Sequence, residues 1–104
     1  MILKELEKII KERIENASPE ESYVAQLHKK GVEKILKKIF EEGLELALAA
    51  KERDKKAVIY EASDLIFHIM VLLGEEQVSI EDILGELERR FGISGIEEKK
   101  QRKN

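Results

Sequence analysis

The sequence predicts an all-α protein, a bundle of four to five helices. Apolar residues recur at spacings of three and four along most of its 104 residues, which is the period of an amphipathic helix. No segment shows the alternation of apolar and polar residues that is typical of a strand. Helix-forming residues dominate, and one proline and six glycines leave few breaks. The length fits one domain, which we place at residues 1–92, followed by a polar tail at 93–104.

The first part of the chain predicts one long helix and one short helix. Residues 2–14 carry their apolar side chains on one face, and the segment from Asn16 to Pro19 ends this helix. Ser18 is the expected N-cap of a helix over 19–29, with Pro19 in its first position and Glu21 completing a capping box. Gly31 is the expected left-handed residue after this helix.

The rest of the chain predicts three helices. The first covers residues 32–53, and the second begins after Asp54 as N-cap and reaches Leu73, with Gly74 ending it. A last helix is expected over 80–91, with Ser79 or Asp82 as its cap. Residues 65–73 are apolar around more of the helix than a surface position needs, so we expect a second copy of the chain to cover them in a homodimer. The alternative is that short helices of the same subunit cover this face.

The composition excludes several classes of protein. The net charge is −3, from 19 basic and 22 acidic residues, which argues against a nucleic-acid-binding protein. There is no cysteine, so disulfides and thiolate chemistry are excluded. The N-terminus lacks the apolar core of a signal peptide, and the longest uncharged run, residues 65–74, is too short to span a bilayer. We therefore expect a cytoplasmic protein without a membrane partner.

Acidic residues interrupt the apolar helix at 54–73 in a regular pattern. Glu61 and Asp64 are three residues apart, and His68 follows four residues later on the same stripe. On the preceding helix, Glu42 and Glu45 are again three apart. Because the link between these helices is short, they should pack as an antiparallel hairpin that brings the two carboxylate pairs together.

Four facing carboxylates repel each other unless a cation lies between them, and an all-oxygen site suits Mg²⁺, with Mn²⁺ as the alternative. Zinc is disfavoured because the chain has two histidines and no cysteine, and the spacing lacks the Glu-x-x-His pairs of di-iron bundles. Taken singly, Glu41, Glu42 and Glu45 also fit a solvated helix face, and His68 fits a core histidine with its hydrogen bonds satisfied. The two carboxylate pairs on consecutive helices favour the metal site.

Two lysines extend the acidic stripe toward the N-terminus. Lys34 and Lys38 lie eight and four residues before Glu42, where they could hold the phosphates of a metal-bound polyphosphate. The alternative is ordinary pairing of lysine with glutamate four residues away on a solvated face.

These segments resemble a known family. The motif EExxE at 41–45 followed by ExxD at 61–64 is similar to the metal motif of the all-α nucleoside triphosphate pyrophosphohydrolases, the MazG-like superfamily. Within it, the chain most resembles the phosphoribosyl-ATP pyrophosphohydrolases of histidine biosynthesis. The resemblance runs from about residue 3 to residue 102, through SYVAQLHKKGVEKILKKIFEEGLE at 22–45, EASDLIFHIMVLL at 61–73 and LERRFGISGIEEK at 87–99. Phe40 and Gly43 depart from the small residues expected there, which affects packing rather than metal chemistry.

The resemblance implies Mg²⁺-dependent hydrolysis of phosphoribosyl-ATP to phosphoribosyl-AMP and pyrophosphate. It implies that Glu42, Glu45, Glu61 and Asp64 bind the metal, and that Glu41 lies beside them or acts as the base. His68 is the second candidate for the base, and Lys34 and Lys38 are expected to bind phosphates. Two alternatives remain: a housecleaning pyrophosphohydrolase of non-standard nucleotides from the same superfamily, and a non-catalytic helical interaction module.

Overall fold

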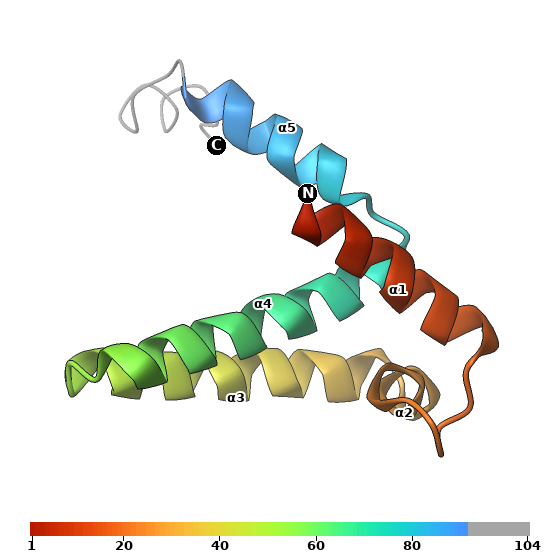
Figure 1. Cartoon of the computed structure of the whole chain (residues 1–104), viewed down its shortest axis with the longest axis horizontal. Coiled ribbons are helices and arrows are strands. Elements are labelled where there is room, and N and C mark those ends of the chain that lie inside the picture. Colours follow the sequence, from red (N-terminus) through yellow and green to blue (C-terminus); the bar gives the residue numbers. More distant parts are fainter. Residues whose placement is uncertain (92–104) are drawn as a thin grey trace.

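The computed structural model describes residues 1–91, which form five α-helices and contain no strand (Figure 1). The all-α prediction is confirmed. The predicted domain boundary at residue 92 and the polar tail at 93–104 lie outside the described residues. The helices are α1 (Ile2–Asn16), α2 (Tyr23–Lys30), α3 (Val32–Lys51), α4 (Lys55–Glu76) and α5 (Ile80–Phe91).

The start of α2 differs from the sequence prediction. Residues 19–21 form a turn rather than a first helical turn, with the amide of Glu21 donating to the carbonyl of Ser18 at 3.0 Å. The N-cap is Ser22, whose buried hydroxyl accepts a hydrogen bond from the amide of Ala25 at 3.2 Å. Both serines suit a cap, so packing of the following residues against the core decided between them. Gly31 does end the helix with a positive φ of 100°, but its ψ of 170° lies outside the left-handed helical region that was predicted.

Helices α3 and α4 form the antiparallel hairpin that the short link predicts (Figure 1). The chain reverses over residues 52–54, where Arg53 adopts a positive φ of 59°. Asp54 then caps α4, and its carboxylate accepts a hydrogen bond from the amide of Ala57 at 3.1 Å. Beyond the end that packs on α1 and α2, the hairpin projects away from the other helices (Figure 1).

Gly74 does not end its helix, contrary to the prediction. Helix α4 continues to Glu76, and Gln77 takes the left-handed conformation at its end, with φ 58° and ψ 39°. A methyl group on Gly74 would lie 3.0 Å from Cγ2 of Ile10 and 3.3 Å from Cδ1 of Ile14. Glycine is therefore present at this position because α1 crosses α4 closely, not because the helix stops.

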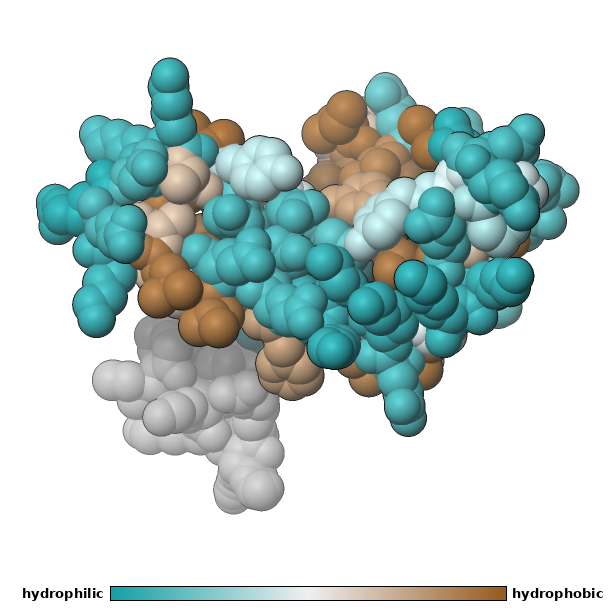
Figure 2. Space-filling model, turned by 90° about the horizontal axis from the view of Figure 1, so that it is seen from below, coloured by the Kyte–Doolittle hydropathy of each residue, from teal (hydrophilic) through white to brown (hydrophobic). Residues whose placement is uncertain are grey.

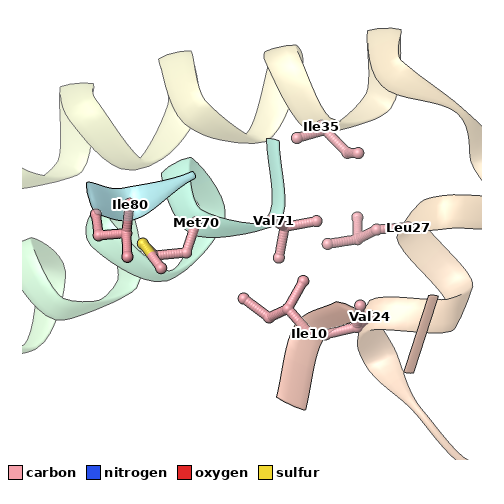
Figure 3. Packing of buried hydrophobic residues seen from close by; sticks show 7 residues of the cluster. All are labelled: Ile10, Val24, Leu27, Ile35, Met70, Val71 and Ile80. Atoms are coloured by element: carbon pink, nitrogen blue, oxygen red, sulfur yellow. The ribbon is translucent and has the colours of Figure 1, made fainter. Parts of the chain in front are cut away.

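The core lies where all five helices meet, beside the end of the hairpin that joins α2 (Figure 3). Helix α5 is attached here through α1: the carboxylate of Glu7 accepts a hydrogen bond from the amide of Ile80 at 2.8 Å, and Lys4 pairs with Glu81. The predicted cap Ser79 also contributes, since its hydroxyl accepts from the amide of Glu81 at 3.1 Å. The buried apolar cluster consists of Ile10, Val24, Leu27, Ile35, Met70, Val71 and Ile80.

Apolar side chains also reach the surface, where they interrupt its hydrophilic cover (Figure 2). Helix α4 as a whole is long and apolar enough to cross a membrane by length and composition, which the uncharged run at 65–74 did not indicate. One such helix is weak evidence, because the core helix of a soluble protein passes the same test. The exposed apolar residues of the hairpin include Leu36, Phe40, Leu44, Leu48, Ile59 and Ile66.

Candidate metal centre

The α3–α4 hairpin brings the two predicted carboxylate pairs together. Oxygen atoms of Glu42, Glu45 and Glu61 lie within 4.8 Å of one another, so that one cation could contact all three. A second group at the same spacing combines Glu42 with Asp64 and His68. Glu42 belongs to both groups, which makes it the centre of the cluster.

Two carboxylate oxygens in this cluster, Oε1 of Glu42 and Oε1 of Glu61, are buried and have no hydrogen-bond partner among the residues that the structure describes. Glu42 is only 4% exposed, and burial together with the neighbouring carboxylate of Asp64 raises the pKa of its carboxyl. Burial and the neighbouring Glu45 likewise raise the pKa of Glu61. A buried, unpaired anionic oxygen costs free energy, so both glutamates would be stabilised by a cation.

Lys38 supplies the one positive charge that contacts Glu42 among the described residues. Its Nζ atom lies 3.3 Å from Oε2 of Glu42 and 3.8 Å from Oε1 of Glu41. Burial alone lowers the pKa of Lys38, but the hydrogen bond to Glu42 and the nearby acidic groups outweigh it and raise the pKa. This is the i, i+4 pairing considered as the alternative to phosphate binding, and it leaves Oε1 of Glu42 without a partner. Lys34 lies one turn earlier and is half-buried.

Glu41 lies beside the cluster rather than inside it. Its side chain is 45% exposed and faces Lys38, and it belongs to neither group of candidate metal ligands. This position leaves its carboxylate accessible to solvent and to a bound substrate.

His68 is buried, at 2% exposure, and both of its ring nitrogens make hydrogen bonds within the chain. Nδ1 lies 2.8 Å from the carbonyl oxygen of Asp64, which can only accept, so Nδ1 carries the proton. Nε2 is then the acceptor of the hydroxyl of Tyr23, at 2.9 Å. To act as a base or a metal ligand, His68 would have to give up one of these bonds, so the satisfied core histidine describes this arrangement better. Its catalytic role stays a prediction.

Tyr23 is a neighbour of the centre that sequence reasoning missed. Burial raises the pKa of its hydroxyl, Lys38 opposes this, and Asp64 and Glu42 add to the increase. The ring stacks on Phe67, with the ring centroids 6.1 Å apart. Tyr23 lies 45 residues from His68 in the chain, and no spacing rule connects the first turn of a short helix with a residue so distant.

Comparison with known proteins agrees with this geometry. The family model described as phosphoribosyl-ATP pyrophosphohydrolase matches residues 3–91. The chain is 45% identical over 103 residues to a phosphoribosyl-ATP pyrophosphatase of Ruthia magnifica subsp. Calyptogena magnifica, covering 99% of this chain and 97% of the relative. It is 48% identical over 101 residues to the protein of that name from Geobacter metallireducens, covering 97% and 92%. It is 51% identical over 87 residues to the one from Neisseria gonorrhoeae, covering 84% and 81%.

An antiparallel hairpin that gathers four carboxylates beside a lysine can hold divalent cations and bind phosphates, which is the chemistry of a pyrophosphohydrolase. The match covers nearly all of the described residues, including both carboxylate pairs. The chain therefore belongs to the phosphoribosyl-ATP pyrophosphohydrolase family of hydrolases.

Proposed function

We propose that this protein hydrolyses phosphoribosyl-ATP to phosphoribosyl-AMP and pyrophosphate with Mg²⁺, the second step of histidine biosynthesis, in the cytoplasm. The observation that carries the proposal is the buried carboxylate cluster in which Oε1 of Glu42 and Oε1 of Glu61 have no partner. Family membership supplies the substrate, since the relatives are named for phosphoribosyl-ATP.

The residues of the cluster fit a hard divalent cation. Glu42, Glu45, Glu61 and Asp64 offer oxygen atoms alone, which is the donor set that Mg²⁺ prefers and that Mn²⁺ also accepts. The raised pKa values of Glu42 and Glu61 mean that their charged forms are disfavoured in the metal-free protein, and a bound cation would stabilise these charged forms. The chemistry that a bound cation supplies is neutralisation of the charge on the leaving pyrophosphate and acidification of the attacking water.

The remaining roles fall to side chains beside the cluster. Lys38, which contacts Glu42 and Glu41 here, would bind a phosphate oxygen of the substrate, and Lys34 would bind phosphate one turn away. Glu41 would take the proton of the attacking water, since its carboxylate is accessible and next to the metal ligands. His68 is the weaker candidate for the base because its Nε2 lone pair already accepts from Tyr23.

We further propose that the active protein is a homodimer. The projecting half of the hairpin has apolar residues on the outer face of α3, and Phe40 in this stripe is 80% exposed. So large an unpartnered apolar surface beside the site is typical of an interface.

An assay of pyrophosphate release from phosphoribosyl-ATP, with and without Mg²⁺, tests the proposed function. Glu61→Gln or Asp64→Asn should lower kcat/KM at least about 100-fold, because loss of even an outer partner of a metal ligand costs up to that much. Glu76→Gln is the matched control, since Glu76 lies exposed at the end of the same helix and should keep the activity of the unmodified protein.

Two outcomes would contradict the proposal. Faster turnover of non-standard deoxynucleoside triphosphates than of phosphoribosyl-ATP would indicate a housecleaning enzyme. If pyrophosphate release continued at the same rate after divalent cations had been chelated, the reaction would not depend on a metal ion.

A further inference from the structure

Tyr23 has three features that no part of the proposed mechanism uses. It begins α2, its hydroxyl reaches His68 on α4, and its charge environment includes Asp64, Glu42 and Lys38 of the metal centre. Among the described residues, the hydrogen-bond partner of its hydroxyl is His68, which links it to Asp64.

The partners of His68 fix both the tautomer and the orientation of its ring. Because Nδ1 faces a carbonyl oxygen, it must carry the proton, and the Tyr23 hydroxyl must then donate to Nε2. The rings of Tyr23 and Phe67 also contact the imidazole in edge-type arrangements, at interplanar angles of 85° and 89° and with ring centroids 5.7 and 5.3 Å from its own. The imidazole has no remaining polar atom and little room to rotate.

This orientation matters to Asp64. The protonated Nδ1 lies 3.8 Å from Oδ1 of Asp64, so the positive end of the N–H dipole faces the carboxylate as well as the carbonyl of the same residue. The opposite tautomer would turn a lone pair toward both oxygens and repel them. In metal sites, a hydrogen bond to the second ring nitrogen of a histidine fixes the orientation of the ring, and loss of this bond weakens metal binding.

We propose that Tyr23 is a positioning residue of the metal centre: its hydroxyl donates to Nε2 and holds the His68 ring in the orientation in which Nδ1–H faces Asp64, and this contact in turn holds Asp64 for metal binding. This inference rests on the proposed metal centre. If Tyr23 has this role, the metal centre is correctly arranged only when α2 packs against the hairpin.

The structure offers a matched control for the docking of α2. Two side-chain hydrogen bonds run from α2 to α4 within the part of the chain that the structure describes, one from Tyr23 to His68 and one between His28 and Glu75 at 2.6 Å. Tyr23→Phe removes the first and keeps the ring stacked on Phe67. His28→Ala removes the second, at the other end of α2 and away from the carboxylates.

Calorimetric titration with Mn²⁺ separates positioning from stability. Tyr23→Phe should weaken Mn²⁺ binding about fivefold, the effect of one partly buried hydrogen bond, whereas His28→Ala should bind as the unmodified protein does. Equal affinity in Tyr23→Phe, or equal weakening in both variants, would overturn the proposal. If the unmodified protein bound no Mn²⁺, the proposed metal centre itself would fail.

Long-range ¹⁵N–¹H NMR of the unmodified protein provides a test that needs no variant. We expect the spectrum of His68 to show a protonated Nδ1 and an unprotonated Nε2. In folded Tyr23→Phe the Nε2 resonance should move, because Nε2 loses its hydrogen bond from Tyr23 while the carbonyl of Asp64 still accepts from Nδ1. A His68 ring protonated at Nε2 alone in the unmodified protein would contradict the proposal, even if Tyr23→Phe did not fold.

Discussion

Glu42 is the only fully buried carboxylate among the described residues, and its surroundings favour the protonated form. Burial and the proximity of Asp64 outweigh the ion pair with Lys38, so the pKa of Glu42 is raised. A group whose pKa is higher in the folded than in the unfolded protein contributes stability at low pH, and this stability is lost as pH rises through the folded-state pKa. In the absence of metal, ionisation of Glu42 therefore destabilises the fold at the same carboxylate that the cation would contact.

Without metal, the protein should lose thermal stability as the pH is raised above 4.5, the ordinary pKa of a glutamate side chain. Glu42→Gln should flatten this decline and raise the Tm at pH 8 in the presence of chelator, because the amide carries no charge to bury. Mg²⁺ should raise the Tm of the unmodified protein at that pH and leave the variant unchanged. Thermal unfolding followed by circular dichroism measures all three.

Glu86 provides a control of opposite sign. Hydrogen bonds from Arg89 and Arg90 lower the pKa of Glu86 to about 2. Glu86 therefore stabilises the folded protein at pH values above its unfolded-state pKa, and this stabilisation is lost as the pH falls toward the folded-state pKa. Glu86→Gln should therefore make the protein slightly less stable at neutral pH, with no dependence on Mg²⁺. A higher Tm for Glu86→Gln than for Glu42→Gln at pH 8 would contradict this assignment.

The crossing of α1 over α4 governs stability at the scale of the elements. Gly74 lies under this crossing, where the side chains of Ile10 and Ile14 leave no ordinary space for a methyl group. Ile10 is almost fully buried in the core cluster, so it cannot move away without disturbing residues of other helices.

Gly74→Ala should lower the free energy of unfolding by about 1 kcal/mol. Overpacking costs roughly 1–3 kcal/mol, and the better helix propensity of alanine returns up to about 1 kcal/mol of this. Gly85→Ala is the control, because nothing lies within 4 Å of the added methyl group and only the gain in propensity remains. Urea denaturation measures both; equal stabilisation of the two variants would show that α1 does not approach α4 this closely.

At the scale of the whole molecule, apolar side chains are well buried at one end of the hairpin and exposed to solvent toward the other. All five helices contribute to the core beside α2, whereas within residues 1–91 the far half of the hairpin has only its own two helices to pack against (Figures 1 and 3). The stripe of Leu36, Phe40, Leu44 and Leu48 on α3 follows a spacing of four residues and faces solvent. A second copy of the chain would cover this stripe.

Light scattering after gel filtration should give twice the chain mass of 12.0 kDa. Leu48→Glu places a charge in the exposed stripe and should shift the mass to that of a monomer and lower the Tm. The exposed Lys55 at the start of α4 offers a control, since Lys55→Glu should leave the mass unchanged. A monomeric mass for the unmodified protein would refute the dimer.

Local patterns in the sequence were sufficient for the elements and for the hairpin. The three-to-four spacing of Ile2, Leu6 and Ile9 predicts α1, and Asp54 caps α4 as expected. They were insufficient where two residues suited the same role, as with Ser18 and Ser22, and where glycine served packing rather than helix termination, as at Gly74. In both cases contacts with another helix decided the outcome.

The sequence by itself determined that the chain is helical and that its carboxylates come in pairs on consecutive helices, because helix periodicity and short links are local properties. Only the tertiary structure decided that Glu42 is central and buried, that Lys38 contacts it, and that Tyr23 reaches His68. These relations depend on how α2 and the hairpin pack, and packing joins residues whose distance along the chain carries no signal of their contact.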